Sequence, residues 1–280
     1  MDLQGFIYQI AGPAVLYFVL WGCARTTEDL SVSGTAEPAT VSDSVVADKD
    51  QRLYGDLLAS AAHTDSLKIL PPGLFHYNEV SPTANGESWF GLFKGNDGYY
   101  LSRTPISLQR VYDPILDADE NSPTGWEVKA LNGDTCLIFI QEADFLRQRK
   151  VHFIEVSPKY VYPGDTLKLD FFGKVYLIYG TGEMKETQIS DYYITWNYKF
   201  HLSQICDGDT TDQVLIDYPF QNDEGKEIIF AGDIDGDKRL DLLIDTTYHY
   251  NVEVPTLFLS APADSAKLVK AIGSHCSVGC

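Results

Sequence analysis

The segment 191–203, "DYYITWNYKFHLS", decides the fold class, because large apolar and more polar side chains alternate along it. Successive side chains of a β-strand point to opposite faces of the sheet, so this alternation predicts one buried and one wetter face. The predicted buried face carries Tyr192, Ile194, Trp196, Tyr198, Phe200 and Leu202. The wetter face carries Tyr193, Thr195, Asn197, Lys199, His201 and Ser203. That second face suits either a plain solvent-facing sheet or a binding surface.

Outward from this segment the chain keeps the same texture of short aromatic and β-branched runs separated by turn residues. Residues 87–112 read as a strand, a turn at 95–98 ("GNDG") and a second strand. Pro163-Gly164 predicts another turn, since proline fixes φ at the first central position and glycine permits positive φ at the second. Further strands are predicted at 213–218, 226–231, 240–246, 255–260 and 267–272.

Helical spacing is confined to two short segments. Leu53, Leu57, Leu58 and Ala61 recur at helical intervals in 50–62, and 141–149 also favours a short helix. The sequence therefore predicts a mainly β fold of sandwich-like or barrel-like sheets, with one or two short helices.

Composition bounds the class of partner. The chain has 280 residues, of which 44% are hydrophobic, and a net charge of −19. Such a chain can build a real core, and its charge disfavours nucleic acid, whose phosphates it would repel. An acidic surface suits cations, basic partners or simple solubility.

The N-terminus has the features of an export signal. Residues 10–22 form an apolar run that is shorter than the roughly 20 residues of a membrane-spanning helix and matches a signal-peptide core. Leu20-Trp21-Gly22-Cys23 resembles the bacterial lipobox. This resemblance implies that residues 1–22 are a signal peptide and that Cys23 is lipid-modified and becomes the first mature residue. The alternative is a buried hydrophobic element with an incidental cysteine.

The residues after Cys23 have the composition of a tether. Residues 24–50 are rich in Ser, Thr, Ala, Pro and Asp, and such a segment buries too little apolar surface to offset its ordering entropy. We expect a lipid-anchored flexible tether at 23–50, followed by a β-rich domain at 51–280, either single or divided into subdomains near 160–190. The expected location is the extracytoplasmic side of a bacterial cell envelope, with the membrane as a partner through the lipid.

Four further cysteines remain after Cys23: Cys136, Cys206, Cys276 and Cys280. An even number in an exported protein predicts two disulfides, and three connectivities stay open. The alternative is a set of isolated buried thiols.

The sharpest chemical signal is "AGDIDGDKRLDLLID", 231–245, where four aspartates lie between positions 233 and 241. Numbered from Asp233, the aspartates occupy positions 1, 3, 5 and 9, and Arg239 occupies position 7. Calcium binds six to eight hard oxygen ligands, and a loop of this spacing supplies carboxylates at 1, 3 and 5 and a backbone carbonyl at 7. Position 9, Asp241, adds a ligand directly or through water. Without an ion these carboxylates repel one another.

The segment "DIDGDKRLDLLID" resembles the calcium loops of FG-GAP and VCBS-type repeats. The matching residues are Asp233, Asp235, Gly236, Asp237, Asp241 and Leu242. Lys238 stands where those repeats usually carry a second glycine and must accept an unusual backbone angle. The resemblance implies a strand–loop–strand calcium site. An EF-hand fits less well, because it needs a bidentate Glu at position 12, where Ile244 stands. Residues 228–280 also resemble the C-terminal part of bacterial lipoproteins, and no activity follows from that likeness.

The sequence contains no catalytic motif that we recognise. Its six histidines form no paired metal-ligand spacing, and there is no nucleophile elbow, phosphate loop or dinucleotide fingerprint. His249 is expected to be a structural histidine or to line a site beside the ion, and the acidic segments 117–121 and 207–212 are expected to be solvated turns. Two functions stay open: a calcium-stabilised lipoprotein that binds a glycan, a protein or an envelope partner, or a calcium-dependent extracytoplasmic hydrolase acting on polysaccharide.

Overall fold

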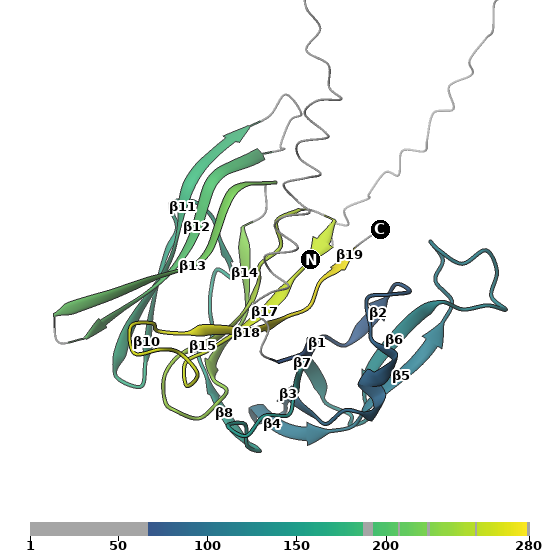
Figure 1. Cartoon of the computed structure of the whole chain (residues 1–280). Coiled ribbons are helices and arrows are strands. Elements are labelled where there is room, and N and C mark those ends of the chain that lie inside the picture. Colours follow the sequence, from purple (N-terminus) through teal and green to yellow (C-terminus); the bar gives the residue numbers. More distant parts are fainter. Residues whose placement is uncertain (1–66, 187–192, 207, 223–224, 250, 279–280) are drawn as a thin grey trace, which may run out of the picture. The chain divides into compact units, whose positions relative to one another are not determined.

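A long, nearly closed antiparallel sheet forms the centre of the protein (Figure 1). The computed structural model describes residues 67–186, 193–206, 208–222, 225–249 and 251–278. In spatial order, the strands of the central sheet are β1 (Ile69–Leu70), β7 (Thr135–Gln141), β3 (Trp89–Gly95), β4 (Gly98–Thr104), β8 (Arg149–Phe153), β14 (Lys226–Asp233), β15 (Asp241–Asp245), β17 (Pro255–Leu259) and β18 (Lys270–Ser274). The short strand β9 (Tyr160–Val161) pairs with the first residues of β14.

The two ends of this sheet meet at a seam. The Leu67 amide, just before β1, donates to the Ile272 carbonyl of β18 at 2.8 Å. A Cβ added at Gly273 would lie 2.4 Å from the Leu67 carbonyl oxygen. Glycine at this position therefore permits the close backbone approach that nearly closes the sheet.

Gly273→Ala should destabilise the protein by about 1–3 kcal/mol, because the added methyl group pushes β18 away from Leu67. Urea unfolding measures the loss. Gly133→Ala is the matched control, since a Cβ there meets no atom within 4 Å. Equal stability of the two variants would show that the seam does not depend on glycine.

Two smaller sheets cover the outside of the central sheet. One contains β10 (Thr166–Phe171), β11 (Lys174–Glu186), β12 (Tyr193–Cys206) and β13 (Asp209–Asn222). The other contains β2 (Gly73–Phe75), β6 (Gly125–Ala130) and β5 (Ile106–Val111). The remaining elements in the described residues are the pair β16 (Val252–Glu253) and β19 (Ser277–Val278), and the 3₁₀ helix η1 (Pro82–Gly86).

Three apolar cores follow from this arrangement. Side chains from the central strands and from two of their connections form the inner core, and each outer sheet packs over a core of its own. Strand β15 shows the consequence for the sequence. Leu243 belongs to the inner core, whereas Leu242 and Ile244 face the core shared with β10–β13. A strand buried on both faces needs a continuous apolar run, which explains "LLI". The structure thus confirms the predicted mainly β, barrel-like class.

Both predicted turns are confirmed. Gly95 and Gly98 pair across the β3–β4 hairpin, and Gly98 has a φ of 104°. At Pro163-Gly164 the Asp165 amide donates to the Tyr162 carbonyl at 3.1 Å, and Gly164 has a φ of 93°. Proline followed by a glycine with positive φ is the arrangement of a type II turn.

The alternation in 191–203 holds only over part of β12. Tyr198, Phe200 and Leu202 are fully buried, as predicted. Trp196, in contrast, is 44% exposed and Thr195 is buried, which reverses the prediction for that end of the strand. The pairing of β11 with β12 shifts register between Thr181 and Glu183, beside the strained Asn197 (φ 52°). A bulge of this kind re-aims the side chains that follow it.

The predicted helix at 141–149 is wrong. Gln141 ends β7, Arg149 begins β8, and the residues between them form an irregular connection. Leu146 is buried in the inner core, so tertiary packing overrides the weak helical spacing. The predicted helix at 50–62 lies outside the described residues. No helix in the part of the chain that the structure describes has the length and apolar character needed to cross a bilayer.

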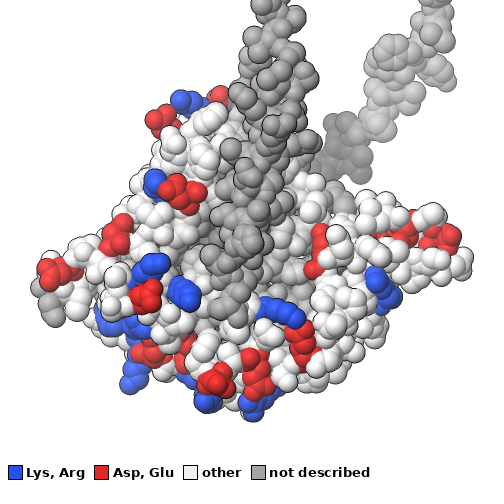
Figure 2. All heavy atoms as spheres, in the orientation of Figure 1, with Lys and Arg blue, Asp and Glu red and all other residues white. Residues whose placement is uncertain are grey.

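Acidic and basic side chains are interspersed over the face shown in Figure 2. Several of them pair with each other across neighbouring strands. Lys199 of β12, for example, contacts Asp217 of β13 at 2.5 Å. Exposed pairs of this kind contribute little to stability, so they say more about solubility than about the fold.

Candidate metal centre

The aspartate-rich loop connects two central strands of the barrel-like sheet. The register of β14 and β15 pairs Gly232 with Asp241, so Asp233 and Asp241 mark the two ends of the loop. Both aspartates are buried, and Asp235 is only 6% exposed. Such burial is unusual for carboxylates and calls for partners that compensate their charge.

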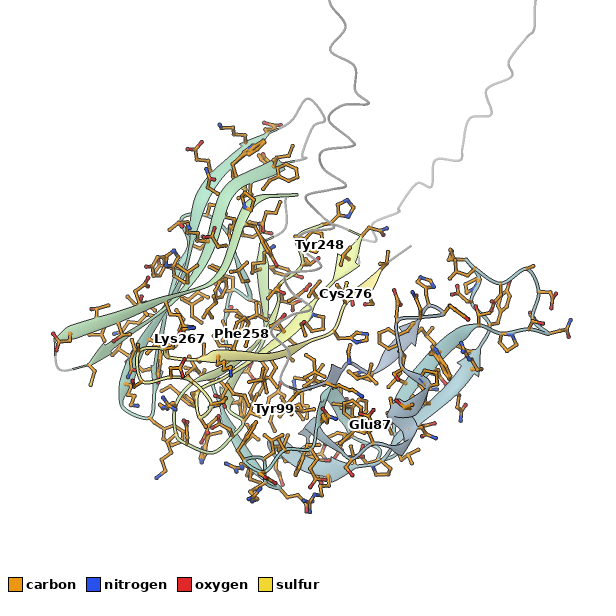
Figure 3. All side chains as sticks on the ribbon, viewed as in Figure 1. Glu87, Tyr99, Tyr248, Phe258, Lys267 and Cys276 are labelled. Atoms are coloured by element: carbon orange, nitrogen blue, oxygen red, sulfur yellow. The ribbon has the colours of Figure 1, made fainter. Side chains whose placement is uncertain are left out.

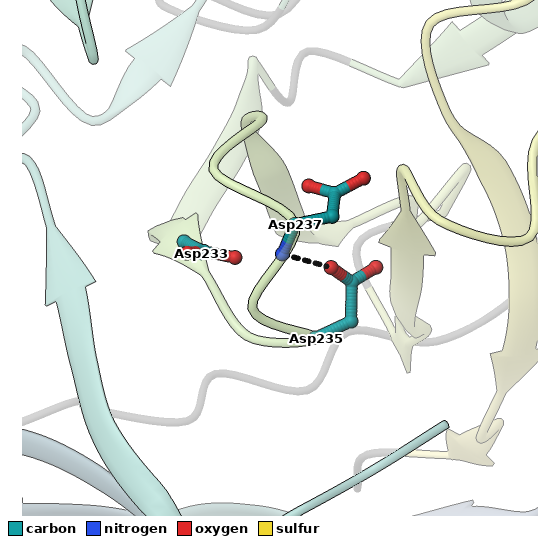
Figure 4. A group of neighbouring side chains, drawn as sticks. All are labelled: Asp233, Asp235 and Asp237. Atoms are coloured by element: carbon teal, nitrogen blue, oxygen red, sulfur yellow. Dashed lines mark hydrogen bonds between the residues drawn. The ribbon is translucent and has the colours of Figure 1, made fainter. Parts of the chain in front are cut away.

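Three carboxylates converge inside the loop. One oxygen each from Asp233, Asp235 and Asp237 lies within 4.8 Å of the other two (Figure 4). Oxygens bound to one calcium ion at 2.3–2.6 Å can lie at most about 5 Å apart, so the spacing fits a shared ion. The all-oxygen donor set also suits a hard cation. These three residues would hold the ion, and the cation would neutralise their mutual repulsion.

Short-range hydrogen bonds curl the loop. The Gly236 amide donates to Asp233 Oδ1 at 2.7 Å, and the Asp237 amide donates to Asp235 Oδ1 at 3.2 Å. The Arg239 amide repeats the pattern with Asp237 Oδ1 at 2.8 Å. Each carboxylate therefore accepts from an amide two or three residues ahead, as aspartates do in turns.

Asp241 has a different place from the other three aspartates. Its Oδ2 accepts from the amides of Ile234 and Asp235 at 2.7 and 3.1 Å. Its Oδ1 accepts from the amide and the hydroxyl of Ser260, both at 2.8 Å. The fully buried Asp241 thus joins both ends of the loop to the end of β17. This structural role does not depend on whether Asp241 also binds an ion.

Burial and like charge act together on two of these carboxyls. Burial, with the nearby Asp237 and Asp233 carboxylates, raises the pKa of Asp235 above its ordinary value. Burial and the Asp235 charge raise the pKa of Asp241 well above its usual range. Both causes disfavour negative charge, and a bound divalent cation would oppose them.

Several residues that complete the site carry no local sequence signal. The Ser260 hydroxyl oxygen also lies 2.9 Å from Asp237 Oδ1, so Asp237 and Asp241 share its single hydrogen, and the Ala261 amide donates to Asp235 Oδ2 at 2.9 Å. The Arg149 guanidinium lies against Gly236, where an added Cβ would be 1.0 Å from Nη1. Ser260 and Ala261 follow the aspartates that they contact by 19 or more positions. Arg149 precedes the loop by a long stretch of chain, so only the fold brings these three residues to the loop.

Arg239 contributes its side chain as well as its backbone. Its Nε donates to Asp237 Oδ2 at 2.6 Å, and its Nη2 contacts the Ser260 carbonyl. The sequence assigned Arg239 only a backbone carbonyl. The positively charged Arg239 guanidinium partly balances the negative charge of the three carboxylates.

Lys238 adopts the unusual backbone angle that the sequence requires, with a φ of 66°. A lysine in this left-handed region is strained, whereas glycine is not.

Lys238→Gly should therefore raise the unfolding free energy by about 0.5 kcal/mol and keep or strengthen calcium binding. Denaturant unfolding and calorimetric titration measure both effects. Lys267→Gly, at an exposed position without positive φ, should give no gain, and a similar gain there would remove backbone strain as the cause.

The other candidate residues lie away from the loop. His249 follows β15 at the end opposite the loop, and burial lowers its pKa. In the acidic segment 117–121, Asp117 accepts hydrogen bonds from Thr124 and from the Asp113 amide. Asp212, from 207–212, belongs to β13 rather than to a turn.

Asp212 is the centre of a network on the wetter face of β12. It accepts from the Tyr179 hydroxyl at 2.9 Å, contacts His201 Nδ1 at 3.0 Å and accepts from the Ser203 hydroxyl. The His201 ring also stacks on Tyr179, with centroids 4.4 Å apart. Serine and histidine both bind the carboxylate, and no bond between the two is present, so this arrangement is a cross-strand network and not a nucleophile–base pair.

The described cysteines are not bridged to one another. Cys136 is buried on β7, and Cys206 is exposed at the end of β12. Cys276, labelled in Figure 3, is partly buried before β19. Burial raises the pKa of the Cys136 thiol to about 12, which makes it unreactive. Cys280 and Cys23 lie outside the described residues, and the disulfide pairing stays a prediction.

No protein-family model matches the chain, and no curated protein or solved structure matches it significantly.

Proposed function

We propose that the protein is an exported, lipid-anchored and calcium-stabilised β-rich protein with a non-catalytic binding role in the bacterial cell envelope. The convergence of Asp233, Asp235 and Asp237 within 4.8 Å carries the calcium part of this proposal. A turn that only reverses the chain has no need of three clustered carboxylates, two of them buried. The ligand of the protein would be a glycan or another envelope protein.

The ion's main effect would be on stability. The loop joins β14 and β15, and Ser260 ties it to the end of β17 through Asp241. An ion that neutralises the loop would hold these three adjacent strands of the central sheet together. Because the same strands contribute to the inner core, the gain would extend to the whole domain.

Two cavities among the described residues favour binding over hydrolysis. Glu79 and Glu87 line a cavity of about 420 Å³, and Asp97 and Asp134 line another of about 410 Å³. Three of these four carboxylates already have partners. Glu87 contacts the Lys68 ammonium at 2.5 Å, Glu79 accepts two backbone amides, and Asp134 accepts from a tyrosine hydroxyl. Carboxylates held this way are poorly placed to serve as a general acid and base.

The lipid anchor is tested at Cys23. Cells fed labelled fatty acid should incorporate it into the protein, and Cys23→Ala should abolish the label and release the protein from the membrane fraction. Cys136→Ala is the control and should keep both label and membrane association. Unlabelled, full-length protein retained in the cytoplasm would rule out the anchor and leave the calcium site to be judged separately.

A further inference from the structure

A cavity of about 420 Å³ lies where the described part of the chain begins. Residues 67–70 form one wall, and the segment around η1 forms another; Glu87, labelled in Figure 3, lies just after η1. The apolar side chains that line the cavity are Leu67, Ile69, Leu70, Val80, Ala84 and Trp89. The lining is therefore largely apolar, and an apolar occupant would suit it.

One polar atom in the wall lacks a partner. His275 lines the cavity, and its Nε2 is buried without a hydrogen-bond partner among the described residues. Burial also lowers the pKa of His275 to about 4, so the ring is neutral at physiological pH. Buried polar atoms in native proteins nearly always have a partner, so this wall is incomplete in the described residues alone.

The chain preceding the cavity has the matching chemistry. In 50–62 the apolar residues recur at helical spacing, so a helix there would carry one apolar stripe. Only residues 63–66 separate this segment from Leu67, and four residues span at most about 14 Å.

We propose that segment 50–62 docks as an amphipathic helix into this cavity, with Leu53, Leu57 and Leu58 toward its apolar wall. The short connection gives the segment a high effective concentration at the cavity, so even weak contacts keep it bound. Docking would fix the point at which the N-terminal part of the chain leaves the domain. The inference does not depend on calcium or on the lipid anchor.

Photocrosslinking in the full chain tests the contact directly. A benzophenone amino acid at position 57 should crosslink within the same molecule to peptides that contain 67–70 or 80–89. The same group at position 59 lies on the opposite side of the helix and should give about tenfold less of these products, because it cannot reach a wall that the tethered helix faces. Equal yields from the two positions would overturn the proposal. So would crosslinked dimers, which would make a second copy the occupant, or an absence of crosslinks, which would leave the cavity to a soluble ligand.

Hydrogen exchange provides an independent test with matched charges. Leu57→Asp should speed exchange of the amides in 67–70 and 274–275 by about tenfold or more, because undocking exposes the cavity wall to water. Ala59→Asp adds the same charge on the other side of the helix and should leave these amides unchanged. Amides in β14 and β15 report that both variants remain folded. Unchanged exchange at 67–70 in Leu57→Asp would contradict docking.

Discussion

Replacing Asp241 by alanine should destabilise the protein by at least about 3 kcal/mol, because the substitution leaves several buried donors without an acceptor. Three backbone amides depend on this carboxylate, those of Ile234, Asp235 and Ser260. Asp241 is fully buried, so water cannot replace the lost acceptors. The effect should appear in urea unfolding with EDTA present, since it arises from the protein's own hydrogen bonds.

Two companion variants make this measurement specific. Asp241→Asn keeps one acceptor oxygen and the side-chain volume, so it should lose less stability than the alanine variant. Asp264→Ala removes an exposed carboxylate and should change stability by no more than about 0.5 kcal/mol. A loss below about 1 kcal/mol for Asp241→Ala would contradict the assigned network, because even one unsatisfied buried donor costs that much.

Removing calcium should have the second large effect. At a free calcium concentration 100 times the dissociation constant, one bound ion adds about 2.7 kcal/mol to the unfolding free energy, and EDTA should remove this gain. Thermal unfolding in EDTA and in millimolar calcium compares the two states. Asp233→Ala and Asp237→Ala should abolish the difference, since each removes one of the three converging carboxylates.

The control for the calcium effect is again Asp264→Ala, which should unfold with the full difference between calcium and EDTA. Magnesium serves as a second control, because it demands a smaller octahedral site and keeps its waters. Identical midpoints of the wild type in calcium and EDTA would mean that the loop is only an acidic turn.

The sequence was most informative where a local pattern matched the environment of a whole strand. The apolar run Leu242-Leu243-Ile244 and its flanks predicted strands on both sides of the loop, and the structure places β14 and β15 there. The loop spacing also predicted that Asp233, Asp235 and Asp237 lie together, because a tight loop fixes the direction of nearby side chains. Lys238 took the left-handed angle that this geometry demands.

Features that depend on distant parts of the chain could not be predicted in this way. Ser260 and Arg149 reach the loop only because β17 and β8 lie near it in the central sheet. The alternation predicted Trp196 to be buried, but a register shift beside Gly182 breaks the alternation and leaves Trp196 exposed. The connection after Gln141 has weak helical spacing, yet the inner core takes Leu146 and excludes a helix.

Calorimetric titration of calcium into the metal-free protein tests the central claim most directly. The account predicts heat from one saturable site in the wild type and no such heat in Asp233→Ala or Asp237→Ala. Circular dichroism of both variants is the control that they remain folded. Lys238→Gly should bind at least as tightly as the wild type. Absence of binding heat in the folded wild type, or unchanged binding in both aspartate variants, would contradict a calcium site at this loop.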